Sequence, residues 1–369
     1  MNRLGRGPIA ATLTAALLMA APASAYTAGR DSKVILLHGR QCHANATSND
    51  KNHMQTDWWR NADATLQSLG WSGTGISVVK MGYYTDKYTV PGTTYDNYDV
   101  WALKHWKGSA SGNTTNHNLH YNRTGCHVKF SGDADYSHTG ECDIRHFAYH
   151  VAWALYNKYT AAGESVDVVA HSMGGLVIRY ALQQVQAGHP DFPPSLLIED
   201  VVTVSTPHGG INSTLNGWYC DDFQTSQMDV GSNFLQSLTS HPEGTGGTDW
   251  TAIGGFEVKC HGLTGDIVSP ESSTWNGADH KVVYANPGYG HEEYFNAGKG
   301  TGSTDTDVFR QDGRGAGTAF TYGCCLACGI PGCGDFGTRC NSSNNAYTGA
   351  TNQSRALEWM DKALRYATW

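Results

Sequence analysis

A serine, an aspartate and a histidine each follow an apolar segment of this chain that is predicted to be a strand. Ser172 comes two residues after the segment Val166–Ala170, whereas Asp266 and His291 come after two later segments. A serine hydroxyl is a weak nucleophile at neutral pH unless a histidine accepts its proton and a carboxylate orients that histidine. Because parallel strands end at one edge of a sheet, the three side chains are predicted to meet there as a catalytic triad.

The residues around Ser172 predict a sharp turn between a buried strand and a helix. The β-branched residues of the segment 166–169 favour the strand, and the apolar periodicity of 176–182 favours the helix. Ala170 and Gly174 are small enough to flank such a turn. The positive end of the following helix would face Ser172 and would stabilise a tetrahedral oxyanion.

The pentapeptide Ala-His-Ser-Met-Gly at residues 170–174 resembles the lipase box of small secreted bacterial lipases and esterases of the α/β-hydrolase superfamily. In chain order the triad is Ser, Asp, His, which is also the order of that superfamily. The resemblance covers roughly residues 33–295 and the last helix. It implies a mostly parallel central sheet with helices on both faces.

The resemblance also implies roles for four residues besides the nucleophile. The turn 263–270 resembles the acid turn of the family and contains Asp266, and the family keeps its histidine on a loop such as Gly290-His291. The buried segment Val34–Leu37 runs into a His-Gly turn, where by resemblance the backbone N–H of Arg40 is one oxyanion donor. The residue after the nucleophile, Met173, is the other.

Other titratable residues compete for these roles. His208, in a Thr-Pro-His segment that also resembles secreted lipases, is expected to line the pocket floor, but it precedes any suitable acid. His280 is the nearest alternative base and is more typical of a polar strand edge. Glu292 and Glu293 are expected to be solvated, and His38 is expected to brace its turn.

Alternating apolar segments predict the elements that carry these residues. Amphipathic helices are expected at 54–69, 143–161 and 352–368, with Asp143 capping the second, and a short helix near 233–238. Strands are expected at 34–37, 76–81, 166–170, 197–205, 250–256 and 281–285.

The first 25 residues have the pattern of a signal peptide. Arg3 and Arg6 precede the short apolar segment Ile9–Ala20, and Ala23-Ser24-Ala25 fits the small-residue cleavage rule. No later segment is apolar enough to span a bilayer. The catalytic domain is therefore expected to be residues 26–369, secreted and extracellular.

Ten cysteines in an exported chain predict up to five disulfides. They are Cys42, Cys126, Cys142, Cys220, Cys260, Cys324, Cys325, Cys328, Cys333 and Cys340. The C-terminal cluster leaves zinc open as an alternative, although it contains no histidine and the compartment is oxidising. A structural calcium also stays open without a recognisable ligand set, and no redox cofactor is expected.

Three segments interrupt the expected fold. Residues 83–142 are predicted to be a long loop insertion whose aromatic residues either line a substrate cleft or pack the insertion itself. Residues 211–249 are a candidate cap over the site. Residues 296–352 are predicted to be a disulfide-rich surface segment.

The composition and the resemblance together favour an enzyme that acts on esters. The formal net charge of −8 argues against a nucleic acid partner. We expect a triacylglycerol lipase or esterase whose substrate is a lipid or ester at an oil–water or polymer surface. An extracellular polyester depolymerase, such as a polyhydroxyalkanoate depolymerase, and a non-catalytic binding protein on the same scaffold are the alternatives.

Overall fold

The computed structural model describes the parts of the chain that carry the predicted site. They are residues 32–40, 57–82, 100–102, 143–211, 223–255, 266, 268, 270–284, 290–291, 293–295, 308–314, 348–350 and 356–365. The predicted signal peptide, all ten cysteines and most of the insertion at 83–142 lie outside these residues.

A single twisted sheet forms the centre of the described structure. Its strands lie in the order β3-β2-β1-β4-β5-β6-β7-β8-β9. The first seven in chain order pair in parallel, and β8 and β9 are antiparallel. The strands are β1 (Lys33–Leu37), β2 (Ser77–Gly82), β3 (Val100–Ala102), β4 (Val166–His171), β5 (Ile198–Val204), β6 (Asp249–Gly255), β7 (His280–Tyr284), β8 (Val308–Asp312) and β9 (Thr348–Ala350).

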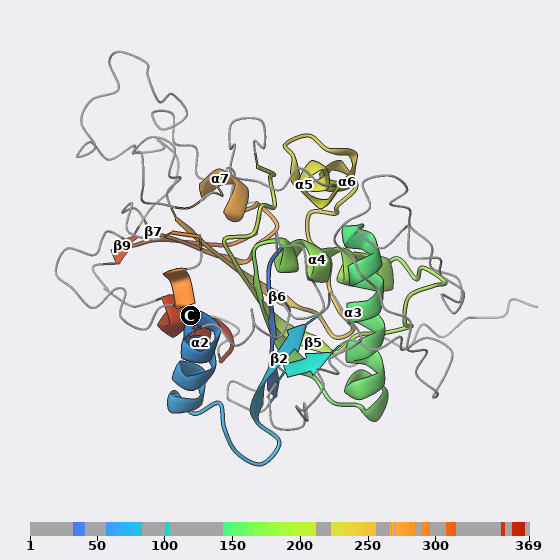
Figure 1. Cartoon of the computed structure of the whole chain (residues 1–369), viewed down its shortest axis with the longest axis horizontal. Helices are drawn as coiled ribbons and strands as arrows, with labels where there is room; N and C mark the ends of the chain where they lie inside the picture. The colour runs from blue at the N-terminus through green and yellow to red at the C-terminus, as the bar shows by residue number, and fades with distance from the viewer. Residues whose placement is uncertain are drawn as a thin grey trace, which may run out of the picture.

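Helices cover both faces of this sheet (Figure 1). They are α2 (Asp57–Ser68), α3 (Ile144–Lys158), α4 (Met173–Gln186), α5 (Phe223–Met228), α6 (Asn233–Gln236), α7 (Pro270–Ser273) and α8 (Ala356–Ala363), with short 3₁₀ turns η2 (Thr160–Ala162) and η5 (Glu293–Phe295). One apolar core lies between the sheet and α3 and α4, and the other between the sheet and α2 and α8. The predicted mostly parallel sheet with helices on both faces is confirmed.

Strand β1 shows why the central strands read as unbroken apolar segments. Ile35 and Leu37 lie in the core under α3 and α4, whereas Val34 and Leu36 lie in the core under α2 and α8. Because successive side chains point to opposite faces, a strand covered on both sides needs apolar residues at every position.

The structure contains strands that the sequence did not indicate. β3 lies inside the predicted loop insertion, and β8 and β9 lie inside the predicted disulfide-rich segment, where they extend the sheet beyond β7. These strands are three to five residues long, and β8 contains Arg310, Gln311 and Asp312. Strands this short give little local signal, and they take their conformation from pairing with a neighbouring strand, which local sequence does not encode.

Two glycines at the start of α4 set how closely that helix approaches the strand ends. A Cβ added to Gly174 would lie 2.5 Å from the carbonyl oxygen of His38. A Cβ added to Gly175 would lie 2.2 Å from Oγ1 of Thr206. Helix propensity alone would favour alanine at both positions. Glycine is present because only a residue without a Cβ lets α4 pack this closely against His38 and Thr206.

Replacement of Gly175 by alanine is expected to lower the free energy of unfolding by about 1–3 kcal/mol, as overpacking does in other cores. Urea unfolding of Gly175→Ala measures this. The double variant Gly175→Ala/Thr206→Ala should recover part of the loss, because it removes the nearest atoms of Thr206. A double variant no more stable than the sum of the two single effects would contradict the proposed contact.

Candidate active site

Ser172 occupies a strained turn between β4 and α4. Its backbone has φ 54° and ψ −129°, a conformation with positive φ that non-glycine residues rarely adopt. The Ser172 N–H donates to the carbonyl oxygen of Val204 at 2.9 Å, which ties the turn to β5. A Cβ on Gly39 would lie 2.6 Å from Cβ of Ser172, so the turn after β1 packs directly on the serine. This is the geometry of a nucleophile elbow.

The structure brings together the three residues of the predicted triad. Oγ of Ser172 lies 2.9 Å from Nε2 of His291. Nδ1 of His291 lies 2.8 Å from Oδ1 of Asp266. With the proton on Nδ1, the histidine donates to Asp266 and its Nε2 is free to accept the serine proton, which is the arrangement that general-base catalysis needs. Catalysis by these residues stays a prediction.

Asp266 is fully buried and its carboxylate is held by further donors. The Tyr294 hydroxyl donates to Oδ2 at 2.6 Å, and the backbone N–H of Val268 donates to Oδ1 at 3.0 Å. A buried carboxylate needs such partners, and here they also fix the direction in which it accepts from His291.

Two residues that the sequence analysis did not single out contact His291. Nε2–H of His171 donates to the backbone carbonyl of His291 at 2.7 Å, and the two rings lie 4.6 Å apart. Oγ of Ser205 lies 2.8 Å from Nδ1 of His291. The only available signal was that Ser205 ends the strand beside the elbow strand. For Tyr294, the donor to Asp266, no sequence signal existed.

Each of the two predicted oxyanion donors adjoins a residue of the elbow or of the turn packed on it. Met173 begins α4, where the first backbone N–H groups have no acceptor inside the helix. Arg40 follows Gly39, the residue packed on Ser172. Donation by Met173 and Arg40 to an oxyanion remains a prediction.

His208 is built into the interior and does not form part of this array. Its Nε2 lies 3.1 Å from Oγ1 of Thr203, and its Nδ1 lies 3.3 Å from the Arg179 guanidinium. Its ring packs on Trp275 at 4.0 Å. Burial, together with the Arg179 charge, lowers the pKa of His208 well below its ordinary value, so it is neutral at physiological pH. These contacts give it a structural role instead of a place on an open pocket floor.

The candidate cap segment packs beside the elbow helix in its described part. Arg179 of α4 donates to the carbonyl of Thr239, and Gln183 donates to that of Ser237. The aromatic rings of Tyr180 and Phe234 lie 5.9 Å apart. Residues 223–249 are therefore anchored to α4, and whether they cover the site stays a prediction.

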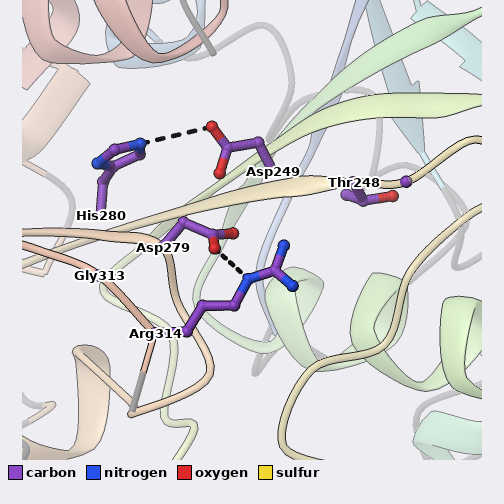
Figure 2. A pocket seen from close by; sticks show the side chains of 7 residues that line it. Thr248, Asp249, Asp279, His280, Gly313 and Arg314 are labelled. Carbon is purple, nitrogen blue, oxygen red and sulfur yellow. Dashed lines mark hydrogen bonds and ion pairs between the residues drawn. The ribbon is translucent and has the colours of Figure 1, made fainter. Parts of the chain in front are cut away.

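His280 lies at the opposite edge of the sheet from Ser172, because it begins β7 whereas Ser172 follows the end of β4. It lines an open cleft of about 400 Å³ with Gly247, Thr248, Asp249, Asp279, Gly313 and Arg314 (Figure 2). Its ring contacts Asp312 at 2.9 Å and Asp249 at 3.4 Å. His280 is therefore excluded as the base for Ser172.

The described residues include no group of three or more His, Cys, Asp or Glu side chains arranged to hold a metal ion. In the same part of the chain, every helix is too short or too polar to cross a membrane.

Comparison with known proteins supports the fold. Residues 143–243 match the family model of the PGAP1-like alpha/beta domain, which covers less than half of the chain. No curated protein matches significantly.

Solved structures give only distant similarity. Phospholipase PlaB from Legionella pneumophila is 10% identical, with a TM-score of 0.36 over 66% of this chain and 44% of that one. Lipase B from Aspergillus fumigatus is 16% identical, with a TM-score of 0.31 over 63% and 40%. The mature lipase BlEst2 from Bacillus licheniformis is 13% identical, with a TM-score of 0.36 over 73% and 88%. The chain spans less than half the length of the first two, and scores this low carry no argument about activity.

The contacts of His280 predict a pH-dependent contribution to stability. Burial lowers its pKa, but the hydrogen bonds and charges of Asp249 and Asp312 outweigh burial and raise the pKa above its ordinary value. A raised pKa in the folded state means a contribution that is fully present below about pH 6.5 and is lost as the pH rises through the raised value.

The difference in unfolding free energy between wild type and His280→Gln should therefore be largest near pH 5–6 and shrink above about pH 6.5. Urea unfolding at a series of pH values measures it. Asp312→Asn should reduce the same pH dependence. A difference that stays constant from pH 5 to pH 8 would rule out the ion pairs as its cause.

Proposed function

We propose that this chain, an α/β-hydrolase by fold, is a serine hydrolase that cleaves carboxylic esters. The observation that carries the proposal is the continuous array from Oγ of Ser172 through His291 to Asp266, with distances of 2.9 and 2.8 Å. The array begins on a strained elbow and ends on a fully buried carboxylate. Strain and buried charge are costly, and both are typical of catalytic sites.

In the acylation step, Oγ of Ser172 bonds to the acyl carbon while its proton moves to Nε2 of His291. Negative charge develops on the former carbonyl oxygen, where the backbone N–H groups of Met173 and Arg40 would donate to it. Asp266 stabilises the imidazolium so formed. When the acyl carbon–oxygen bond breaks, His291 returns the proton to the leaving alcohol.

In the deacylation step, a water molecule attacks the acyl-enzyme and gives a proton to His291. The second tetrahedral intermediate then expels Oγ of Ser172, which regains the proton, and the carboxylic acid leaves. The atoms balance with water as the only co-substrate.

We propose that the substrate is an extracellular lipid or another extracellular ester. The signal pattern at residues 1–25 supports export, and the lipase box at 170–174 supports a triacylglycerol lipase or esterase. The polyester depolymerase alternative uses the same chemistry and differs only in the acyl polymer that must reach Ser172.

Ser172→Ala is expected to lower kcat/KM for p-nitrophenyl esters by roughly 10⁴-fold or more, and Asp266→Asn by about 10⁴-fold, because both remove parts of one proton-transfer unit. Ser72→Ala is a matched control, since Ser72 is exposed and precedes β2 at the other edge of the sheet. Equal rates for wild type and Ser172→Ala would support the non-catalytic alternative. A serine-directed phosphonate should label Ser172, and labelling elsewhere would contradict the assignment.

The natural substrate is expected to be an emulsified triacylglycerol or a simple ester. Hydrolysis rates on tributyrin, on a p-nitrophenyl ester series and on a polyhydroxyalkanoate film separate the candidates. Clearing of the film without tributyrin hydrolysis would replace the lipase assignment by the depolymerase.

The amino-terminal sequence of protein from the culture medium should begin at Tyr26, after the predicted cleavage site.

A further inference from the structure

Two serines, and not one, approach the ring of His291. Oγ of Ser172 lies 2.9 Å from Nε2, and Oγ of Ser205 lies 2.8 Å from Nδ1. The second serine follows β5, the strand that pairs with the elbow strand β4. Both serines therefore lie at the same edge of the sheet, on opposite sides of one imidazole.

Ser205 shares the unusual backbone of the nucleophile. Within the described part of the chain, Ser172 and Ser205 are the only non-glycine residues with positive φ, at 54° and 48°. The N–H of Ser205 donates to the carbonyl of Ile253 at 2.7 Å, which holds this conformation against β6. Glycine would adopt it at lower cost, so a serine here indicates a use for its hydroxyl.

We propose that Ser205 is a positioning residue for the base, and that its hydroxyl orients His291 and stabilises the protonated ring during turnover. This proposal rests on the proposed role of His291. Oδ1 of Asp266 and Oγ of Ser205 each lie 2.8 Å from Nδ1, so a proton on Nδ1 has two acceptors within hydrogen-bond distance. Sharing one hydrogen between two acceptors restrains the ring more tightly than a single acceptor does, and it places a second lone pair beside the positive charge.

The tautomer decides which serine is the nucleophile. Asp266 is an acceptor and holds the proton on Nδ1, so Nδ1 has no lone pair with which to deprotonate Ser205. Nε2 has that lone pair and faces Ser172. The two hydroxyls therefore have different roles: Ser172 gives up its proton, and Ser205 accepts a hydrogen bond.

Backbone contacts make the ring restraint effective. His171, which directly precedes the nucleophile, holds the carbonyl of His291 at 2.7 Å, so the loop that carries the base is tied to the elbow itself. With the backbone of His291 fixed there and its Nδ1 fixed by Asp266 and Ser205, Nε2 has one direction in which to point. That direction is toward Ser172.

The titratable groups near His291 are Asp266, His171, Tyr294 and Glu293. Asp266 contacts the ring, His171 contacts its carbonyl, Tyr294 contacts Asp266, and the Glu293 carboxylate accepts from the N–H of Gly290. All four remain when Ser205 alone is replaced. A change in the pH profile of such a variant therefore reports the missing hydroxyl.

The experiment compares Ser205→Ala and Ser205→Gly with wild type on a soluble p-nitrophenyl ester. Both variants remove the hydroxyl, but glycine also relieves the positive φ. We expect kcat to fall about tenfold in both, as for the loss of one hydrogen bond in the transition state, with KM unchanged. The acidic limb of kcat/KM should move to lower pH in both, because the protonated ring loses an acceptor.

Ser272→Ala is the matched control. Ser272 is also a buried serine, but its hydroxyl donates to the backbone carbonyl of Gly210 at 2.6 Å and not to His291. Its replacement should leave the acidic limb in place. In an Asp266→Asn background, Ser205→Ala should have a smaller effect than in wild type, because both residues act through Nδ1.

The outcomes separate this proposal from the proposed function. If Ser172→Ala abolishes activity while Ser205→Ala keeps the wild-type kcat and pH profile, the positioning role fails and the hydrolase assignment stands. The role also fails if Ser205→Gly restores wild-type kinetics and only Ser205→Ala is slow, since the backbone would then be the cause. Phosphonate labelling of Ser205 in place of Ser172 would overturn both.

Discussion

Close contact between the turn after β1, the elbow and the start of α4 is the constraint on which the site depends. Ser172 lies at the carboxyl edge of the sheet because two glycines permit close packing there. Gly39 leaves room for the side chain of Ser172, and Gly174 leaves room for the backbone of His38. The same packing holds Ser172 at positive φ, a conformation that an isolated chain would leave. The fold therefore supplies the energy that keeps the Ser172 hydroxyl beside Nε2 of His291 and at the amino terminus of α4.

The second requirement is a buried carboxylate that can still accept a hydrogen bond from His291. Asp266 is removed from water, and Tyr294 and the backbone of Val268 replace the lost solvent. Donors fixed in place need no reorganisation when charge appears on the imidazole, which is the advantage of a preorganised site over solution. The base itself lies between strand ends, with one serine at each ring nitrogen.

The carboxyl and amino ends of the strands carry different groups. The carboxyl edge carries Ser172, His291 and Asp266, the candidate triad, at the position where sites form in open α/β sheets. The amino edge of β6 and β7 carries the ion pairs of Asp249, His280 and Arg314, which join β6, β7 and the end of β8. This separation explains how a histidine at a strand terminus can be structural in one place and a candidate base in another.

Local sequence patterns were enough to predict six of the seven parallel strands, the main helices and the positions of Ser172, Asp266 and His291. These features follow from apolar strands, small residues at a turn, and polar residues just past strand ends. The sequence did not reveal β3, β8 and β9, which exist through pairing with neighbours. Nor did it reveal Ser205, His171 and Tyr294 as partners of the triad, since contacts between residues up to 120 positions apart are set by strand order and register. That His208 makes core contacts and His280 makes ion pairs became clear from the tertiary structure alone, because the role of a histidine depends on the groups that surround it.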